Sequence, residues 1–167
     1  VWRVIRQPQI LDAWGFRRGA FEAALRLSLL FALPATVLLA GIGLSLGRFP
    51  IPRTFWIVLV LYPLWGIAQQ FALQALVTRN LRGILPCLNA RSLVVAGLFS
   101  LAHFPNAWLM LLVFPAGLVF TWVFERHRNI YAIGLVHGLL GSLAYYLILG
   151  QDPGADLLSM VSNILGR

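Results

Sequence analysis

The 167-residue chain contains no lysine, one cysteine and only five acidic residues. The single thiol, Cys87, cannot form an internal disulfide and has no neighbour at a metal-ligand spacing, so we expect it to be inert. Internal repeats and low-complexity tracts are also absent. We therefore expect one domain over residues 1–167, with no linker and no soluble module.

What the chain has instead is apolar sequence. Hydrophobic residues make up 60% of it, charged residues 11%, and the mean hydropathy is +0.83, which is far outside the range of soluble domains. The thirteen arginines give a formal charge of +8, yet they stand singly between apolar runs and not in a stripe with interleaved aromatic residues. This pattern excludes nucleic acid as a partner and indicates membrane lipids.

Apolar runs predict an all-α polytopic membrane helix bundle with about five transmembrane helices. The N-terminal segment mixes arginines with aromatic and aliphatic residues, as helices at a membrane surface do, and the C-terminal segment has the pattern of an amphipathic surface helix. We expect interfacial helices near both ends, and prolines within three of the spans. The expected spans cover residues 22–46, 54–78, 91–104, 107–124 and 130–149, and the expected surface segments cover residues 1–19 and 155–167.

The arginines also predict an orientation, because the cytoplasmic side of a membrane protein carries more of them. With the N-terminus inside, nine arginines outside the spans lie on the inner side and three on the outer side. We therefore expect an integral protein of the bacterial cytoplasmic membrane with a cytoplasmic N-terminus. The inner set is Arg3, Arg6, Arg17, Arg18, Arg79, Arg82, Arg91, Arg126 and Arg128, and the outer set is Arg48, Arg53 and Arg167.

Polar side chains within the spans need partners or a cavity, so they are candidates for a functional site. At about 1.5 Å of rise per residue, Gln70, His103 and His137 all lie roughly 12 to 18 Å from the inner side. We expect these three side chains to converge on one cavity open to the inner half of the membrane. Gly134 and Gly138 stand four residues apart and form a small-residue face beside His137. Such a face allows another helix to approach closely.

Each signal also has a plainer interpretation. The amides of Gln69, Gln70 and Gln74 can act as hydrogen-bonding contacts between helices, worth roughly 0.6 to 2 kcal/mol each. Each histidine can be a satisfied core residue. Three unrelated polar residues need not fall at one depth, so their common depth argues against these plainer interpretations. We interpret Glu125 and Arg126 as ordinary interface charges.

Three short motifs, in this order, resemble those of the CAAX-protease and bacteriocin-processing enzyme family of intramembrane proteases. The family motifs are Glu-Glu-x-x-x-Arg, then Phe-x-x-x-His, then His-x-x-x-Asn or Asp. The resemblance covers roughly residues 54–149, although both glutamates, the arginine and the asparagine are replaced here. The corresponding residues in this chain are Gln69, Gln70 and Gln74, then Phe99 and His103, then His137 and Gly141.

The resemblance implies a membrane endopeptidase that acts on membrane-proximal protein or peptide segments. We expect no cofactor, with a divalent metal as the weaker alternative. On this resemblance we expect catalytic roles for His103 as the base or the group that positions water, for His137 as the oxyanion donor, and for Gln69 and Gln70 as groups that orient water or peptide. An amide cannot accept a proton from water at neutral pH, so we expect weakened hydrolysis. The expected substrate-binding residues are Gln74, Phe99, Asn106 and Gly141.

Two alternatives stay open from the residues alone. The protein can be an inactive relative that binds a membrane peptide in an immunity, scaffold or chaperone role. A metal or ion transporter is a weaker interpretation, because two histidines and amides without a carboxylate make a poor divalent site.

Overall fold

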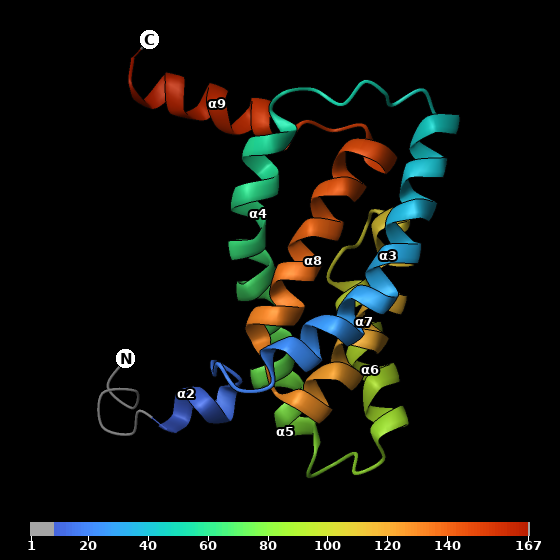
Figure 1. Ribbon diagram of the computed structural model, residues 1–167, viewed down its shortest axis with the longest axis vertical. Coiled ribbons are helices and arrows are strands. Elements are labelled where there is room, and N and C mark those ends of the chain that lie inside the picture. The colour runs from blue at the N-terminus through green and yellow to red at the C-terminus, as the bar shows by residue number, and fades with distance from the viewer. Residues whose placement is uncertain (1–8, 167) are drawn as a thin grey trace.

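Figure 1 shows the computed structural model, which describes residues 9–166 and contains only helices and connecting segments in that part of the chain. Four helical stretches are long and apolar enough to cross a membrane. A fifth apolar helix is shorter, and its 14 residues span only about 21 Å. The predicted all-α membrane helix bundle is confirmed. The long stretches are Phe21–Ser45, Phe55–Leu81, Ala107–His127 and Ile130–Leu149, and the short one is Leu88–Leu101.

The elements follow the predicted order. The second stretch is continuous from α4 through a π-helix, η1, into α5, and the last one passes from α8 into a second π-helix, η2. The bounds are α2 Gln9–Trp14, α3 Phe21–Ser45, α4 Phe55–Gln70, η1 Phe71–Thr78, α5 Arg79–Leu81, α6 Leu88–Leu101, α7 Ala107–His127, α8 Ile130–Ala144, η2 Tyr145–Leu149 and α9 Pro153–Ile164.

Two helices project from the side of the bundle near opposite ends of α4, namely α2 and α9 (Figure 1). Asp152 caps α9 by accepting a hydrogen bond from Ala155 N, and Pro153 occupies the first turn. The apolar side chains of α9 are exposed, among them Met160 and Ile164. This is the form expected of a surface helix at the C-terminal end. Of the arginines used to predict orientation, Arg3, Arg6 and Arg167 lie outside the described residues.

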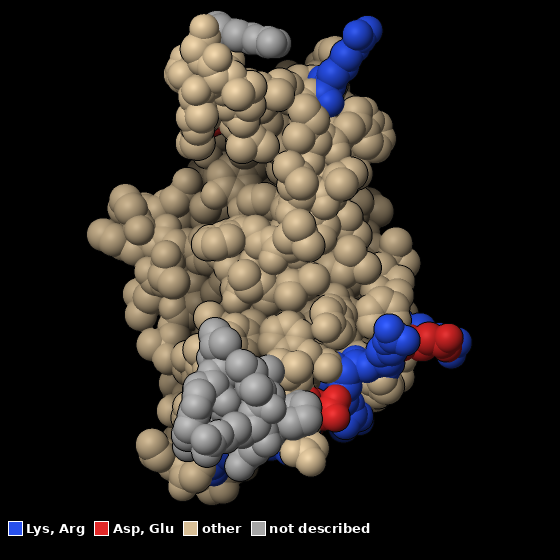
Figure 2. Space-filling model, turned by 90° about the vertical axis from the view of Figure 1, so that its left-hand side faces the viewer, with Lys and Arg blue, Asp and Glu red and all other residues tan. Residues whose placement is uncertain are grey.

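The surface of the bundle is apolar between its ends. Figure 2 shows arginine and acidic side chains at the two ends of one face, with an uncharged band between them. Large aliphatic side chains are exposed along the spans, and Val60 at 74%, Leu64 at 67% and Leu111 at 65% are examples. A soluble domain does not leave so many apolar residues in water, so this band is the lipid-facing surface.

The closest helix pair is α4 and α8. A Cβ added at Gly134 would lie 2.6 Å from Ile67 Cα, and one at Gly138 would lie 2.6 Å from Pro63 N. Both positions therefore exclude any side chain, and the two backbones pack directly on each other. Gly66 on α4 is similarly covered by the α8 backbone at Gly134 and Gly138. The sequence-based expectation of a close approach along the Gly134–Gly138 face is met.

Polar contacts connect the helices at the end of the bundle that carries α5. The Glu125 carboxylate accepts hydrogen bonds from Arg82 Nε at 3.0 Å and Arg91 Nη2 at 2.9 Å, and its side chain is only 10% exposed. Arg91 also donates to the carbonyl groups of Leu85 and Pro86. The prediction that Glu125 is an ordinary interface charge is wrong, because it joins the segment after α5 to α6 and α7.

Candidate active site

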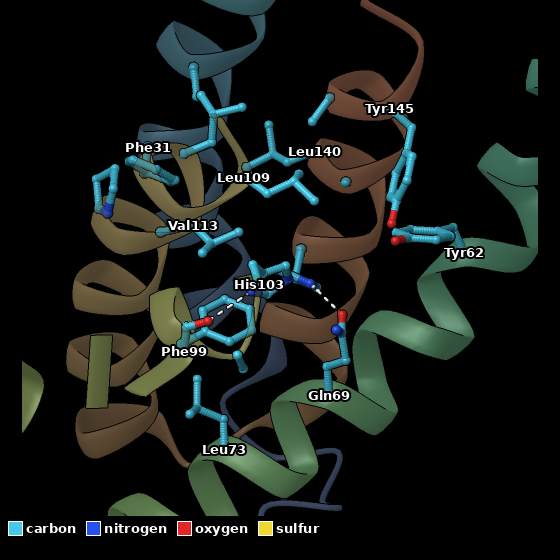
Figure 3. Close-up of a pocket in the computed structure, with 18 of the residues that line it drawn as sticks. Phe31, Tyr62, Gln69, Leu73, Phe99, His103, Leu109, Val113, Leu140 and Tyr145 are labelled. Carbon is cyan, nitrogen blue, oxygen red and sulfur yellow. Dashed lines mark hydrogen bonds between the residues drawn. The ribbon is translucent and has the colours of Figure 1, made fainter. Parts of the chain in front are cut away.

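A cavity of about 940 Å³ lies between α3, α4 with η1, α6, α7 and α8. Most of its wall is aliphatic or aromatic, with Leu73, Val113 and Leu140 as examples (Figure 3). Such a space suits an apolar occupant that a few polar groups orient. The polar side chains that line it are Tyr62, Trp65, Gln69, His103, His137 and Tyr145.

His103 follows the C-cap of α6, in the turn that leads to α7. Its Nδ1 lies 2.8 Å from the carbonyl oxygen of Phe99, one helical turn earlier. A carbonyl can only accept a hydrogen bond, so Nδ1 carries the proton. In the neutral ring this leaves Nε2 unprotonated, as a hydrogen-bond or proton acceptor. The ring is therefore held in the tautomer that a general base requires.

His137 on α8 lies opposite Gln69 on α4. Its Nε2 is 2.8 Å from Gln69 Oε1, so the imidazole donates to the amide oxygen. In Figure 3 this hydrogen bond is the dashed line that ends at Gln69. The Phe99 ring lies beside both histidines, with centroid distances of 5.0 Å to His103 and 5.4 Å to His137. Gln69, His103 and His137 thus face one apolar space from three different helical segments.

Gln70 is placed differently from our expectation. It is fully buried and does not line the cavity. Gln74 Nε2 donates to Gln70 Oε1 and to Thr121 Oγ1, both at 3.2 Å, and Thr78 Oγ1 donates to Gln74 Oε1 at 2.9 Å. Successive helical residues point about 100° apart, so only one of two neighbouring glutamines can face α8. The expected convergence of Gln70 with the histidines is wrong, and Gln69 takes that place.

The other predicted site residues also fall into two groups, those that line the cavity and those that do not. Phe99 and Gly141 line the cavity, whereas Gln74 belongs to the buried amide network. Asn106 does not line the cavity, because its side chain caps α7 by accepting a hydrogen bond from Leu109 N at 3.1 Å. The structure therefore gives Asn106 a capping role in place of the expected contact with substrate.

A π-helix begins directly after the glutamine pair, at Phe71. The Thr78 hydroxyl donates to Leu73 O at 3.1 Å and to the buried amide of Gln74. π-Helical turns are rare and are frequently found at functional sites. Here η1 runs from the cavity wall toward α5.

Sequence reasoning missed two lining residues, Tyr62 and Tyr145. Their rings meet edge to face with centroids 5.7 Å apart, and Figure 3 shows their hydroxyl ends turned toward each other. Tyr62 stands seven residues before Gln69, which is two helical turns, so a shared face was available as a signal.

The donors available for a metal ion are few. In the part of the chain that the structure describes, no three side chains of the His, Cys, Asp or Glu type lie together in a way that could hold one. The expectation that the protein needs no cofactor stays a prediction.

Comparison with known proteins gives a family. A family model described as type II CAAX prenyl endopeptidase Rce1-like matches residues 50–143, which is more than half of the chain. No curated protein and no solved structure matches the chain. The matched range contains Gln69, His103 and His137 and most of the cavity wall. The chain therefore belongs to the Rce1-like family of CAAX proteases, which are intramembrane proteases.

Proposed function

We propose that this protein hydrolyses a peptide bond in a membrane-proximal protein or peptide segment bound in the cavity. One observation carries the proposal: His103, with its Nε2 left as an acceptor, and the Gln69–His137 pair face the same apolar cavity. Membership of a membrane protease family supports the reaction class. A cavity of about 940 Å³ has room for several residues of an apolar segment.

The reaction begins with a water molecule beside His103. The water oxygen attacks the carbonyl carbon of the substrate while His103 Nε2 takes one of its protons, giving a tetrahedral intermediate and an imidazolium. The intermediate collapses when the C–N bond breaks, and His103 returns the proton to the leaving nitrogen. The products are a new carboxyl terminus and a new amino terminus, and the histidine is regenerated.

His137 would stabilise the negative charge that develops on the carbonyl oxygen. Its Nε2–H donates to Gln69 in the free protein. When substrate binds, the carbonyl oxygen can replace or share the Gln69 oxygen as acceptor of that hydrogen. Fixed donors of this kind lower the barrier by a few kcal/mol. Gln69 would then act as the group that holds His137 in its tautomer and orientation.

Gln69 sets the expected rate. The family motif has glutamate at this position, and an amide cannot accept the proton of water. Loss of a general base costs about 10²- to 10⁴-fold, so His103 alone should support slow hydrolysis. The same observation supports a second candidate function, in which the protein binds a membrane segment without cleaving it.

The test is a cleavage assay in lipid vesicles. The wild type, His103→Ala and the matched control His127→Ala are reconstituted with synthetic single-span peptides in H₂¹⁸O. Mass spectrometry should find new peptide termini, with ¹⁸O in the new carboxylate, for the wild type and the His127 variant but not for His103→Ala. Cleavage by His103→Ala at the wild-type rate would refute the assigned site. Peptide binding without any cleavage product would refute hydrolysis and support the second candidate function, in which the protein only binds the segment.

A further inference from the structure

Where α4 packs on α8, Tyr62 lies against Gly141, next to the contact between Gln69 and His137. His137 and Gly141 are one turn apart on α8, and Gln69 and Tyr62 are two turns apart on α4. A Cβ added at Gly141 would lie 2.6 Å from Tyr62 Cε1, 3.2 Å from its Cδ1 and 3.7 Å from its Cζ. The space where position 141 would carry a side chain is therefore filled by the Tyr62 ring.

This matters because the family motif carries asparagine or aspartate at the position of Gly141, and such a side chain supplies a polar group to the cavity. The chain lacks that group, yet Gly141 still lines the cavity. Tyr62 lines the same wall and is only partly buried, as is Tyr145 across from it. A phenolic hydroxyl donates a hydrogen bond as an amide does, so a polar group is present although it comes from another helix.

We propose that the hydroxyl groups of Tyr62 and Tyr145 form a second carbonyl-binding position in the cavity, in place of the side chain that Gly141 lacks. The proposal rests on the proposed function, in that the occupant is a peptide segment. The two tyrosine rings pack edge to face at 5.7 Å, which fixes the direction of both hydroxyls. Both tyrosines line the same cavity as aliphatic residues such as Leu112, Leu140 and Ala144.

The spacing also suggests which carbonyl is bound. One turn of α8, from His137 to Gly141, rises about 6 Å. An extended peptide advances about 3.3 Å per residue, and its carbonyl groups point the same way at every second residue. Because the Tyr62 ring fills the side-chain space of Gly141, we infer that the carbonyl at the tyrosine pair is two residues from the one at His137. The cavity would then recognise the backbone of an extended segment at two points, with apolar side chains between them.

Binding can be measured without relying on cleavage. The probe is an N-acetylated trileucine aldehyde, prepared with a ¹³C label at each amide carbonyl in turn and added to the full-length protein in detergent. Infrared difference spectra should show one amide carbonyl shifted to lower wavenumber in the wild type. Tyr62→Phe should remove that shift and weaken binding by about 2- to 12-fold, as expected for one lost hydrogen bond. Tyr131→Phe, which alters a tyrosine outside this cavity, should match the wild type.

A pair of variants tests the replacement itself. Gly141→Asn alone should lower the thermal midpoint and weaken probe binding, because its Cβ meets the Tyr62 ring. Tyr62→Ala with Gly141→Asn should bind the probe more tightly than Tyr62→Ala alone and recover a shifted carbonyl. If Tyr62→Phe keeps the shift, or if the double variant binds no better than Tyr62→Ala, the tyrosine position is wrong. A tyrosine-dependent shift without cleavage of any peptide would refute hydrolysis and leave the carbonyl site intact.

Discussion

Gln69 Oε1 and His137 Nε2 lie 2.8 Å apart although 68 positions separate the two residues in sequence. The contact depends on how closely α4 and α8 approach, and that distance is set by glycine. A Cβ at Gly138 or Gly134 would collide with the α4 backbone. The small-residue face of α8 and the chemistry of the cavity are therefore linked.

Gly138→Ala tests this link. The added methyl group must push α4 and α8 apart, because the atoms it meets are the backbone of Pro63 and Tyr62. We expect a loss of about 1–3 kcal/mol of stability, as for overpacked cores, together with weaker peptide cleavage or binding. Thermal unfolding in detergent measures the first effect and the vesicle assay the second.

The matched control is Gly97→Ala on α6, where an added Cβ meets nothing within 4 Å. Alanine is the better helix former, so this variant should be as stable as the wild type or slightly more so. Equal stability of the Gly138 and Gly97 variants would contradict the close approach of α4 and α8.

Glu125→Gln should destabilise the end of the bundle that carries α5. It removes the charge that pairs with Arg91, whose side chain is 6% exposed, and with Arg82. Breaking a buried ion pair from one side typically costs about 3–5 kcal/mol, and the partial exposure of Arg82 reduces this to about 3 kcal/mol. Glu22→Gln is the control, because its pair with Arg26 is 79% and 83% exposed and should contribute less than about 0.5 kcal/mol. Similar unfolding midpoints for the two variants would show that Glu125 is not a structural residue.

The surroundings of Asp152, where α9 begins, predict that the stability of the protein depends on pH. Desolvation opposes its ionisation, but hydrogen bonds from Tyr146, Thr54 and the Ala155 and Gly154 backbone outweigh that effect and hold its pKa below the ordinary value. Tyr146 OH and Thr54 Oγ1 lie 2.6 and 2.7 Å from its carboxylate oxygens. Because the folded pKa is depressed, this contribution to stability is fully present above the unfolded pKa of about 3.9 and is lost as pH falls through the folded pKa.

Asp152→Asn should therefore lower the midpoint of thermal unfolding at pH 6. Near pH 3 the midpoints of the variant and the wild type should become equal. Asp156→Asn, one turn further along α9 and outside the hydrogen bonds to Tyr146 and Thr54, should lower the midpoint of thermal unfolding at pH 6 by less than Asp152→Asn does. A constant difference between Asp152→Asn and the wild type from pH 6 to pH 3 would contradict the assigned hydrogen bonds.

The sequence predicted the bundle well, because an apolar run long enough to cross a bilayer has few alternatives to a helix. It also predicted that His103 and His137 face one cavity, since both come from helices at a similar depth. It misplaced Gln70, because the choice between two adjacent glutamines depends on a rotation of α4 that only packing against α8 fixes. It did not reveal η1, since π-helices have no sequence period of their own. Glu125 was missed for a related reason: its partners, Arg82 and Arg91, are distant in sequence.

Orientation in the membrane stays a prediction from the arginines. Reporter fusions after Arg18, Phe49, Pro86, Asn106 and Arg128 should report alternating sides, beginning in the cytoplasm, because nine of the twelve arginines outside the spans then lie inside. Fusions at Arg18 and Pro86 on opposite sides of the membrane would overturn this topology.

The central claim is that Gln69, and not its neighbour Gln70, stands at the reacting centre, and two single substitutions test it. Gln69→Glu restores a proton acceptor beside His137, whereas Gln70→Glu places a carboxylate in a fully buried network outside the cavity. The measurement is the initial rate of peptide cleavage by each variant in vesicles, normalised to folded protein. Gln69→Glu should cleave at least about tenfold faster than the wild type, and adding His103→Ala should abolish the gain. A faster rate for Gln70→Glu with no gain for Gln69→Glu would contradict the account.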